Sequence, residues 1–250
     1  GKVGNTRWSR STQYFNAETE EIEQVTNYEY YDEEGKGSIA NYLLREQSTT
    51  NSLGDTIKQE ILYPQNKGYS SLIAKNMLNI PVQTKVFKND TLLSDKSTVY
   101  STSVFPDIIQ VAKGNQFLED RLIFERFENE NLVQVKQANG TTTSYVWGYD
   151  KRYIVAKVEN ATYAQIEALN NFGNDFEIST GLSAAQESSL RSLSGAMVTT
   201  YTYEPLVGVT SMTDPRGNKI TYEYDNMNRL KVVKDRDNNI LSENQYNYKN

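Results

Sequence analysis

The sequence predicts a mainly β protein, with antiparallel hairpins arranged in a large curved or spirally rolled sheet that carries a small helical insertion. Three observations predict this class. The chain of 250 residues contains 18 Tyr, 8 Phe and 2 Trp, and aromatic side chains suit a pleated, half-buried surface. Apolar and polar residues alternate over short stretches, as they do in strands with one buried face. Clusters of Gly, Asn and Asp separate these stretches and indicate hairpin turns.

Degenerate β-hairpin repeats are expected over residues 1–160. The strongest local signal is Asn139-Gly140, because this pair between alternating runs favours a tight hairpin turn. A further hairpin is expected over residues 83–100, with its turn at Asn89-Asp90. Another copy is expected over residues 28–37, with its turn in the last five of them. The spacing of the copies varies, so the sequence does not predict a strict solenoid.

Two segments depart from the β pattern. Residues 69–79 carry apolar side chains at helical spacing and predict a short helix. Residues 161–197 are expected to form a helical insertion, in which Thr162 serves as an N-cap. Ser183 and Gln186 have the spacing of a capping box and predict the start of a second helix there.

Hairpins are expected again over residues 198–250, where the alternation is clearest. Residues 219–224 read Lys-Ile-Thr-Tyr-Glu-Tyr and place one apolar and two aromatic side chains on the same face of a strand. Turns rich in Asn and Asp follow over residues 225–228 and 235–239.

The composition argues against most catalytic chemistry. The chain has no Cys, so it has no disulfide, thiolate metal site or thiol nucleophile. It has no His, which removes the commonest general base and metal ligand and excludes a Ser-His-Asp triad. The net charge is −6 without a basic stripe, which argues against a nucleic-acid partner. We therefore expect a protein that is not an enzyme, without catalytic residues, cofactor or metal.

One motif in the last hairpins resembles a known family. Residues 208–250 resemble the tyrosine-aspartate repeat, or Rhs-type, family, and residues 145–161 and 196–209 resemble its Bacteroidetes-type members. The motif positions are occupied by Gly217, Tyr222, Tyr224, Asp225, Arg229 and Leu230. The usual Gly before the Arg is replaced by Asn228, which also tolerates positive φ, so we expect the turn to form.

The resemblance implies long strands wound into a spiral shell that often encloses a toxin or another polypeptide. It also implies export beyond the cytoplasm, with the protein secreted, at the cell surface or associated with the outer membrane. The family supplies no catalytic residues for the repeats. On this basis the chain is expected to be a non-catalytic structural segment, and a C-terminal fragment of a longer protein. Its expected partners are other segments of its parent polypeptide or an enclosed or neighbouring protein.

An alternative is a binding module, either an adhesin for surface glycans or a subunit of an outer-membrane assembly. Its candidate aromatic surface consists of Trp147, Tyr149, Tyr201 and Tyr203. Exposed rings at these positions favour a binding role, whereas buried rings favour a sheet core or cross-strand pairs. A third hypothesis, a hydrolase that uses acidic residues, requires two close carboxylates, at least one with a raised pKa.

Two short motifs have a functional and a structural interpretation. Asp214-Pro215-Arg216-Gly217 resembles the Asp-Pro-x-Gly signature of self-cleaving Rhs cores, but the apolar residues expected after the Gly are missing. Residues 235–239 resemble the start of a calcium loop, but Ile240 occupies the position that requires Gly. We interpret both segments as hairpin turns.

Overall fold

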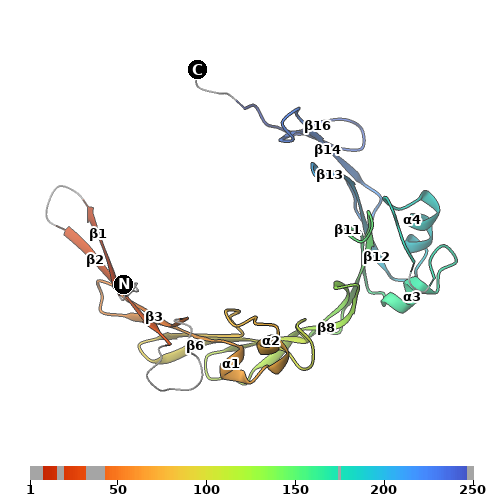
Figure 1. The fold of residues 1–250 in the computed structure, drawn as a ribbon. Coiled ribbons are helices and arrows are strands. Elements are labelled where there is room, and N and C mark those ends of the chain that lie inside the picture. The colour runs from red at the N-terminus through yellow and green to blue at the C-terminus, as the bar shows by residue number, and fades with distance from the viewer. Residues whose placement is uncertain (1–7, 16–19, 32–42, 174–175, 247–250) are drawn as a thin grey trace. The chain divides into compact units, whose positions relative to one another are not determined.

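A computed structural model describes residues 8–15, 20–31, 43–173 and 176–246. The chain divides into two compact units, Gly1–Ile123 and Phe124–Asn250. The described residues form sixteen strands and four short helices (Figure 1).

Strands of the first unit follow one another in chain order, and each is antiparallel to the next. They are β1 (Trp8–Phe15), β2 (Glu20–Tyr30), β3 (Leu44–Thr50), β4 (Thr56–Leu62), β5 (Gln83–Lys88), β6 (Thr91–Val99), β7 (Ile108–Lys113) and the first part of β8 (Glu119–Glu128).

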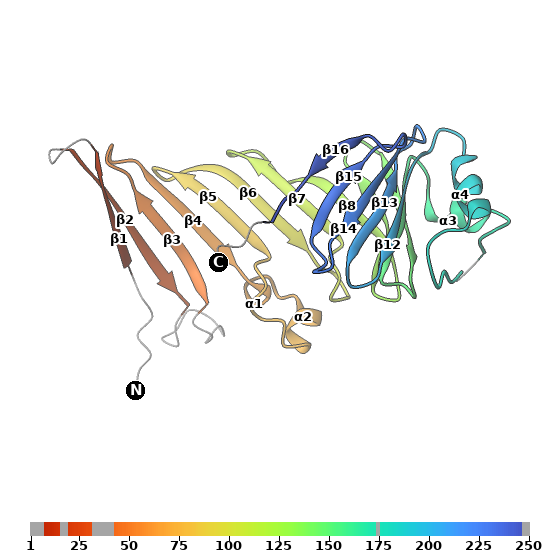
Figure 2. The ribbon, with the colours of Figure 1, turned by 90° about the horizontal axis from the view of Figure 1, so that it is seen from above.

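Strands of the second unit follow the same rule. After the end of β8 they are β9 (Asn131–Gln137), β10 (Thr142–Gly148), β11 (Tyr153–Glu159), β12 (Met197–Glu204), β13 (Gly208–Thr213), β14 (Lys219–Tyr224), β15 (Leu230–Lys234) and β16 (Ile240–Glu243). Within each unit, neighbours in the sequence lie side by side (Figure 2). The mainly β, antiparallel class is therefore confirmed.

The predicted tight turn between residues 83 and 100 is confirmed by β5 and β6. Asn89 and Asp90 connect them with φ of 48° and 64°, the left-handed pair that a two-residue hairpin loop requires. The turn predicted within residues 33–37 lies outside the described residues.

Two short helices in the first unit connect β4 to β5. These are α1 (Pro64–Lys67) and α2 (Ser70–Ala74). The helix expected over residues 69–79 is shorter than predicted, because Asn76 takes a left-handed φ of 56° just after α2. The sequence analysis missed α1, although a Pro at its first position is a recognised start signal.

Two helices in the second unit, α3 (Tyr163–Glu167) and α4 (Ala184–Arg191), lie between β11 and β12. Thr162 and Ser183 cap them as predicted, because each side chain accepts the backbone N–H of the residue three positions later. No helix among the described residues is long and apolar enough to cross a membrane.

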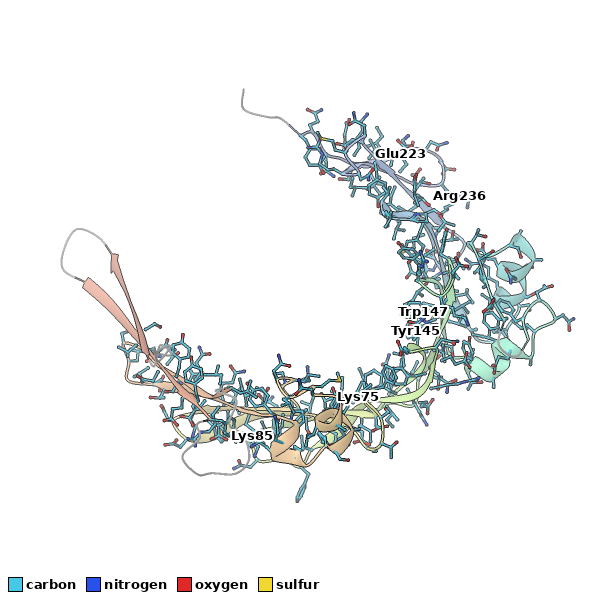
Figure 3. The ribbon with its side chains drawn as sticks, viewed as in Figure 1. Lys75, Lys85, Tyr145, Trp147, Glu223 and Arg236 are labelled. Atoms are coloured by element: carbon cyan, nitrogen blue, oxygen red, sulfur yellow. The ribbon has the colours of Figure 1, made fainter. Side chains whose placement is uncertain are left out.

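The core of the second unit lies between its sheet and these two helices, which sit together on one side of the strands (Figure 1). Val146, Ala156 and Val158 from the sheet are fully buried against Ile166 of α3 and Leu190 of α4. Apolar burial of this kind contributes about 1.5–3 kcal/mol per large side chain. Alternation along β10 then directs Tyr145, the neighbour of Val146, to the opposite face (Figure 3).

Candidate functional site

The repeat motif forms a closed five-residue turn between β14 and β15. Asp225 N–H donates to the Arg229 carbonyl at 2.9 Å, and Asn228 N–H donates to the Asp225 carbonyl at 3.0 Å. Asp225 Oδ1 accepts the backbone N–H groups of Met227 and Arg229 at 2.8 and 3.0 Å. Asn228 has a φ of 59°, so the exchange of the motif Gly for Asn preserves the turn, as predicted.

The same turn occurs on both sides of the motif, over residues 214–218 and 235–239. Asp214 and Asp235 each accept two backbone N–H groups on Oδ1 at 2.8–2.9 Å. On Oδ2 each accepts the side-chain amide of the Asn four residues later at 2.9 Å. Gly217 takes a φ of 84° in the first of them. The structural interpretation of both short motifs is therefore confirmed, since both Asp235 oxygens are engaged within the turn.

Arg229 joins its own turn to the next part of the chain. Its Nε donates to Asp225 Oδ2 at 2.8 Å, and its guanidinium lies 4.1 Å from the ring centroid of Tyr246. Hydrogen bonds from the Arg229 side chain, and then from backbone N–H groups, hold the pKa of the Asp225 carboxyl below its usual value. The planar, always charged guanidinium suits this double role.

Among the described residues, four tyrosines that lie in a strand or shortly follow one donate a hydrogen bond from the hydroxyl to a carbonyl of the strand before that one. We call them latch tyrosines. All four O–H···O distances are 2.9 Å, and the pairs are Tyr63 with Leu44, Tyr203 with Ile154, Tyr224 with Val209 and Tyr246 with Leu230. Two of the motif residues have other roles: Tyr222 lies opposite Val233 in the β14–β15 pair, and Leu230 is half-buried.

The position of Tyr224 also explains why residue 208 is a glycine. A Cβ atom at Gly208 would lie 2.4 Å from the Tyr224 hydroxyl oxygen, which is closer than any real contact. The aromatic ring of the repeat motif therefore requires Gly208, which the sequence analysis did not assign a role.

The candidate aromatic surface is largely engaged in contacts within the sheet. Trp147 Nε1 donates to the Leu132 carbonyl at 2.9 Å. The Tyr149 hydroxyl donates to the Tyr203 carbonyl at 3.0 Å and accepts the Tyr203 N–H at 2.9 Å. The Tyr149 ring packs edge-on against Tyr153 and Tyr203, which stack on each other at 4.8 Å. Burial raises the pKa of the Tyr203 hydroxyl.

Tyr201 differs from the other three members of this set. It is half-buried and lies opposite Met212 in the β12–β13 pair. Its neighbour Thr200 bonds to Glu187 of α4 at 3.1 Å, so Tyr201 points to the sheet face away from α4. Tyr153, which the sequence analysis missed, packs against the rings of Tyr149 and Tyr203.

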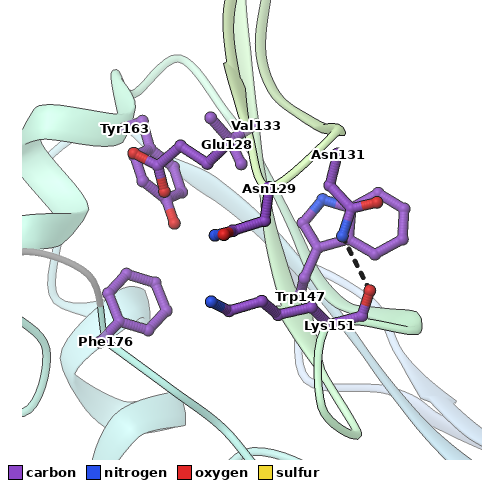
Figure 4. Close-up of a pocket in the computed structure, with 8 residues that line it drawn as sticks. All are labelled: Glu128, Asn129, Asn131, Val133, Trp147, Lys151, Tyr163 and Phe176. Carbon is purple, nitrogen blue, oxygen red and sulfur yellow. Dashed lines mark hydrogen bonds between the residues drawn. The ribbon is translucent and has the colours of Figure 1, made fainter.

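A small cavity lies beside this set, at the ends of strands β9 and β10 (Figure 4). Its lining consists of Glu128, Asn129, Asn131, Val133, Trp147, Lys151, Tyr163 and Phe176. Asn131 Nδ2 donates to the Lys151 carbonyl at 2.8 Å across its edge. The cavity volume is about 20 Å³, room for one water molecule and too little for a sugar.

Two carboxylates near this cavity are bound to one arginine. Arg126 donates to both oxygens of Glu167 at 2.8 Å and forms an ion pair with Glu128. Its guanidinium lies 4.8 Å from the ring centroid of Tyr163. Burial, and then the nearby Glu128 carboxylate, raise the pKa of the Tyr163 hydroxyl. This network fastens α3 to β8 and engages both carboxylates with one guanidinium. Within the described ranges, no three acidic side chains come together as a metal site.

Comparison with known proteins places a repeat in the last hairpins. Residues 207–240 match the family model described as RHS Repeat. No curated protein sequence matches the chain. The matched range contains the motif residues and all three Asp-led turns, so the predicted repeat is confirmed for this segment.

Solved structures with a similar arrangement include toxin complexes. A crystal structure of TcdB2-TccC3-Cdc42 has a TM-score of 0.41 at 12% identity, over 90% of this chain and 10% of that chain. The Tc holotoxin pore of Photorhabdus luminescens has a TM-score of 0.34 at 12% identity, over 89% of this chain and 12% of that chain. The chain therefore spans about a tenth of the length of these relatives.

Proposed function

We propose that this chain is a non-catalytic structural segment of an Rhs-repeat protein. In this proposal it forms part of a β-shell that encloses or displays another polypeptide outside the cytoplasm. The observation that carries the proposal is the use of the motif side chains. Tyr224, Asp225 and Arg229 all bind the chain's own backbone or neighbouring side chains. Residues with this role hold strands in place, which supports a structural segment.

In the second unit, α3 and α4 cover one face of the sheet, and no helix among the described residues of this unit covers the other. Tyr145 and Tyr201 lie on that other face. A polypeptide held by this segment would contact that second face, through half-buried aromatic rings that suit an apolar partner. This expectation gives the proposal a defined geometry.

The alternative binding module receives less support from the aromatic rings. A surface that stacks on sugars needs rings with a free face, but the ring of Tyr203 is stacked on Tyr153 and contacted edge-on by Tyr149. The adjoining cavity holds only a water-sized volume. An adhesin or outer-membrane subunit therefore remains the second candidate.

A photo-crosslinking experiment in the native host tests the proposal. A photoreactive amino acid at Tyr201 should crosslink to a polypeptide, because this position faces away from α4. The same group at Ser188, an exposed residue of α4, is the matched control and should give no such product. The measurement is gel mobility followed by mass spectrometry of extracytoplasmic and cytoplasmic fractions.

Three results would contradict the proposal. They are the absence of a polypeptide product at Tyr201, equal products at both positions, or a product found only in the cytoplasmic fraction. A glycan product at Tyr201 would instead favour the binding module.

A further inference from the structure

Three successive hairpin turns of the second unit depend on a carboxylate at the same position. In each turn one oxygen of Asp214, Asp225 or Asp235 accepts two backbone N–H groups at 2.8–3.0 Å. The other oxygen accepts a hydrogen bond at 2.8–2.9 Å from the side chain of the residue four positions later. Hydrogen bonds to an ionised acceptor are about twice as strong as neutral ones. The turns therefore depend on the charge of the aspartate.

A fourth turn, in the first unit, has the same backbone with the two side chains exchanged. Over residues 51–55, Asn51 Oδ1 accepts the N–H groups of Leu53 and Asp55 at 3.0 and 2.9 Å. Gly54 N–H donates to the Asn51 carbonyl at 3.0 Å, as the fourth residue does in the other turns. Here an amide oxygen holds the backbone N–H groups, and an amide does not titrate in water. The carboxylate of this turn, Asp55, instead binds Lys88 at 2.9 Å and Asn89 at 2.7 Å, and these contacts lower its pKa. The chain thus contains a version of its own turn in which no titrating group holds the backbone N–H groups.

Within the described part of the chain, few charges other than the turn's own donors face these aspartates. Arg216 lies beside Asp214, and Arg191 of α4 donates to the Asp214 backbone carbonyl at 3.0 Å. Arg229 is the charged partner of Asp225. Next to Asp235, Arg236 and Asp237 lie 3.9 Å apart and largely offset each other.

We propose that the three Asp-led turns are released by acid. They open together when their carboxylates are protonated, while the turn over residues 51–55 stays closed. A neutral carboxyl is a weaker acceptor, and its added proton competes with the donors that surround it. The inference does not depend on what the segment encloses.

The direction of the pH dependence follows from the same contacts. The side chains of Asn218, Arg229 and Asn239 are the main causes that hold the pKa values of the three aspartates below the usual 3.8. A lowered folded-state pKa means that the stabilisation is complete above the unfolded value and is lost as pH falls through the folded value. The stabilisation of the turns should therefore be complete from neutral pH to about pH 4 and should be lost progressively as the pH falls further.

Amide hydrogen exchange on the full chain, corrected for intrinsic rates, tests this proposal. Between pH 6 and pH 3, the N–H groups two and four residues after each aspartate should lose about fivefold in protection. These amides belong to residues 216, 218, 227, 229, 237 and 239. The amides of Leu53 and Asp55 should keep their protection over the same range.

An exchange of two side chains provides the matched variant. The double substitution Asp214→Asn and Asn218→Asp keeps composition and net charge but recreates the arrangement of residues 51–55. In this variant the amides of residues 216 and 218 should stay protected at pH 3, while the other two turns open. If the double variant does not fold at neutral pH, the single substitution Asp214→Asn gives the same comparison.

Two outcomes would overturn the proposal. One is an exchanged turn that opens at the same pH as the original. The other is loss of protection at Leu53 and Asp55 together with the three Asp-led turns, because this would show general acid unfolding.

Discussion

At the scale of single residues, the repeat motif is a set of internal connections. Tyr224 reaches the preceding strand, Asp225 closes the turn, and Arg229 binds that turn while covering the ring of Tyr246. The first two contacts add side-chain connections between strands that the sheet ladder already pairs, β13 with β14 and β14 with β15. The motif therefore combines turn formation with attachment of the next strand.

Gly208 should not tolerate even the smallest side chain. Gly208→Ala places a Cβ atom 2.4 Å from the Tyr224 hydroxyl. The Tyr224 side chain must therefore move, or its hydrogen bond to the Val209 carbonyl must break. We expect a loss of about 1–3 kcal/mol in unfolding free energy, measured by urea denaturation. Gly173→Ala, where nothing lies within 4 Å of the new atom, is the control and should be close to neutral. Because the φ of 155° at Gly208 also strains any side chain placed there, the contact is isolated by repeating Gly208→Ala in a Tyr224→Ala background, where an unchanged loss would show that Tyr224 is not the cause.

Arg229 should resist replacement by lysine. Arg229→Lys retains the charge but loses the planar face over Tyr246 and the fixed Nε contact with Asp225. We expect about 0.5–1.5 kcal/mol of destabilisation, with faster amide exchange in β15 and β16. Arg236→Lys, whose side chain is 65% exposed, should have no measurable effect. Unchanged exchange in Arg229→Lys would assign the motif Arg a role other than attachment.

At the scale of elements, the strand pairs of the first unit include one unfavourable row. Glu46 of β3 lies directly opposite Glu29 of β2 and Glu60 of β4. Arg45 binds Glu29 at 2.7 Å and Lys58 lies 3.2 Å from Glu60, whereas no ion pair forms at Glu46 among the described residues. Like charges directly opposite each other weaken strand pairing.

Removing the middle charge should therefore stabilise these strands. Glu46→Gln should raise the unfolding free energy by about 0.5 kcal/mol at pH 7. Burial, together with Glu29 and Glu60, raises the pKa of the Glu46 carboxyl against the opposing effect of Lys58 and Arg45. A raised folded-state pKa means that wild-type stability grows as pH falls through that value, so the difference between the proteins should shrink toward pH 4. Urea denaturation at several pH values measures it, and a difference independent of pH would contradict this explanation.

At the scale of the whole molecule, the two units differ in the depth of their cores. In the second unit, eleven buried residues of the sheet and of the segment containing α3 and α4 form one cluster. Among the described residues of the first unit, the buried hydrophobic side chains are Tyr63, Leu72, Val82 and Ala112. Stability should therefore be unequal along the chain.

Hydrogen exchange at increasing urea concentration should reveal this inequality. Amides of β10, β11 and β12 should be the last to exchange, because their strands lie beneath α3 and α4. Amides of β3 to β6 should exchange at lower urea concentration. Simultaneous exchange of both sets would show a single cooperative unit and contradict the expectation.

Several features were predictable because their causes are local. Alternation and turn residues predicted the hairpins, and the spacing of Ser183 and Gln186 predicted a helix start that the structure confirms. The tolerance of Asn228 for positive φ followed from its side chain alone. The predicted length of the helix near residue 70 was wrong. Asn76 has a left-handed φ that ends the helix, and the spacing of apolar residues does not report backbone conformation.

The sequence by itself determined the β class, the hairpin turns, the helix caps and the repeat motif, since each of these depends on neighbours within about five residues. Only the tertiary structure decided which carbonyl each latch tyrosine binds and which rings cluster. Tyr149 and Tyr203 are 54 positions apart, and the helical insertion separates them in the chain. No local pattern encodes such a contact, because it depends on the register of strands that meet only after the chain has folded.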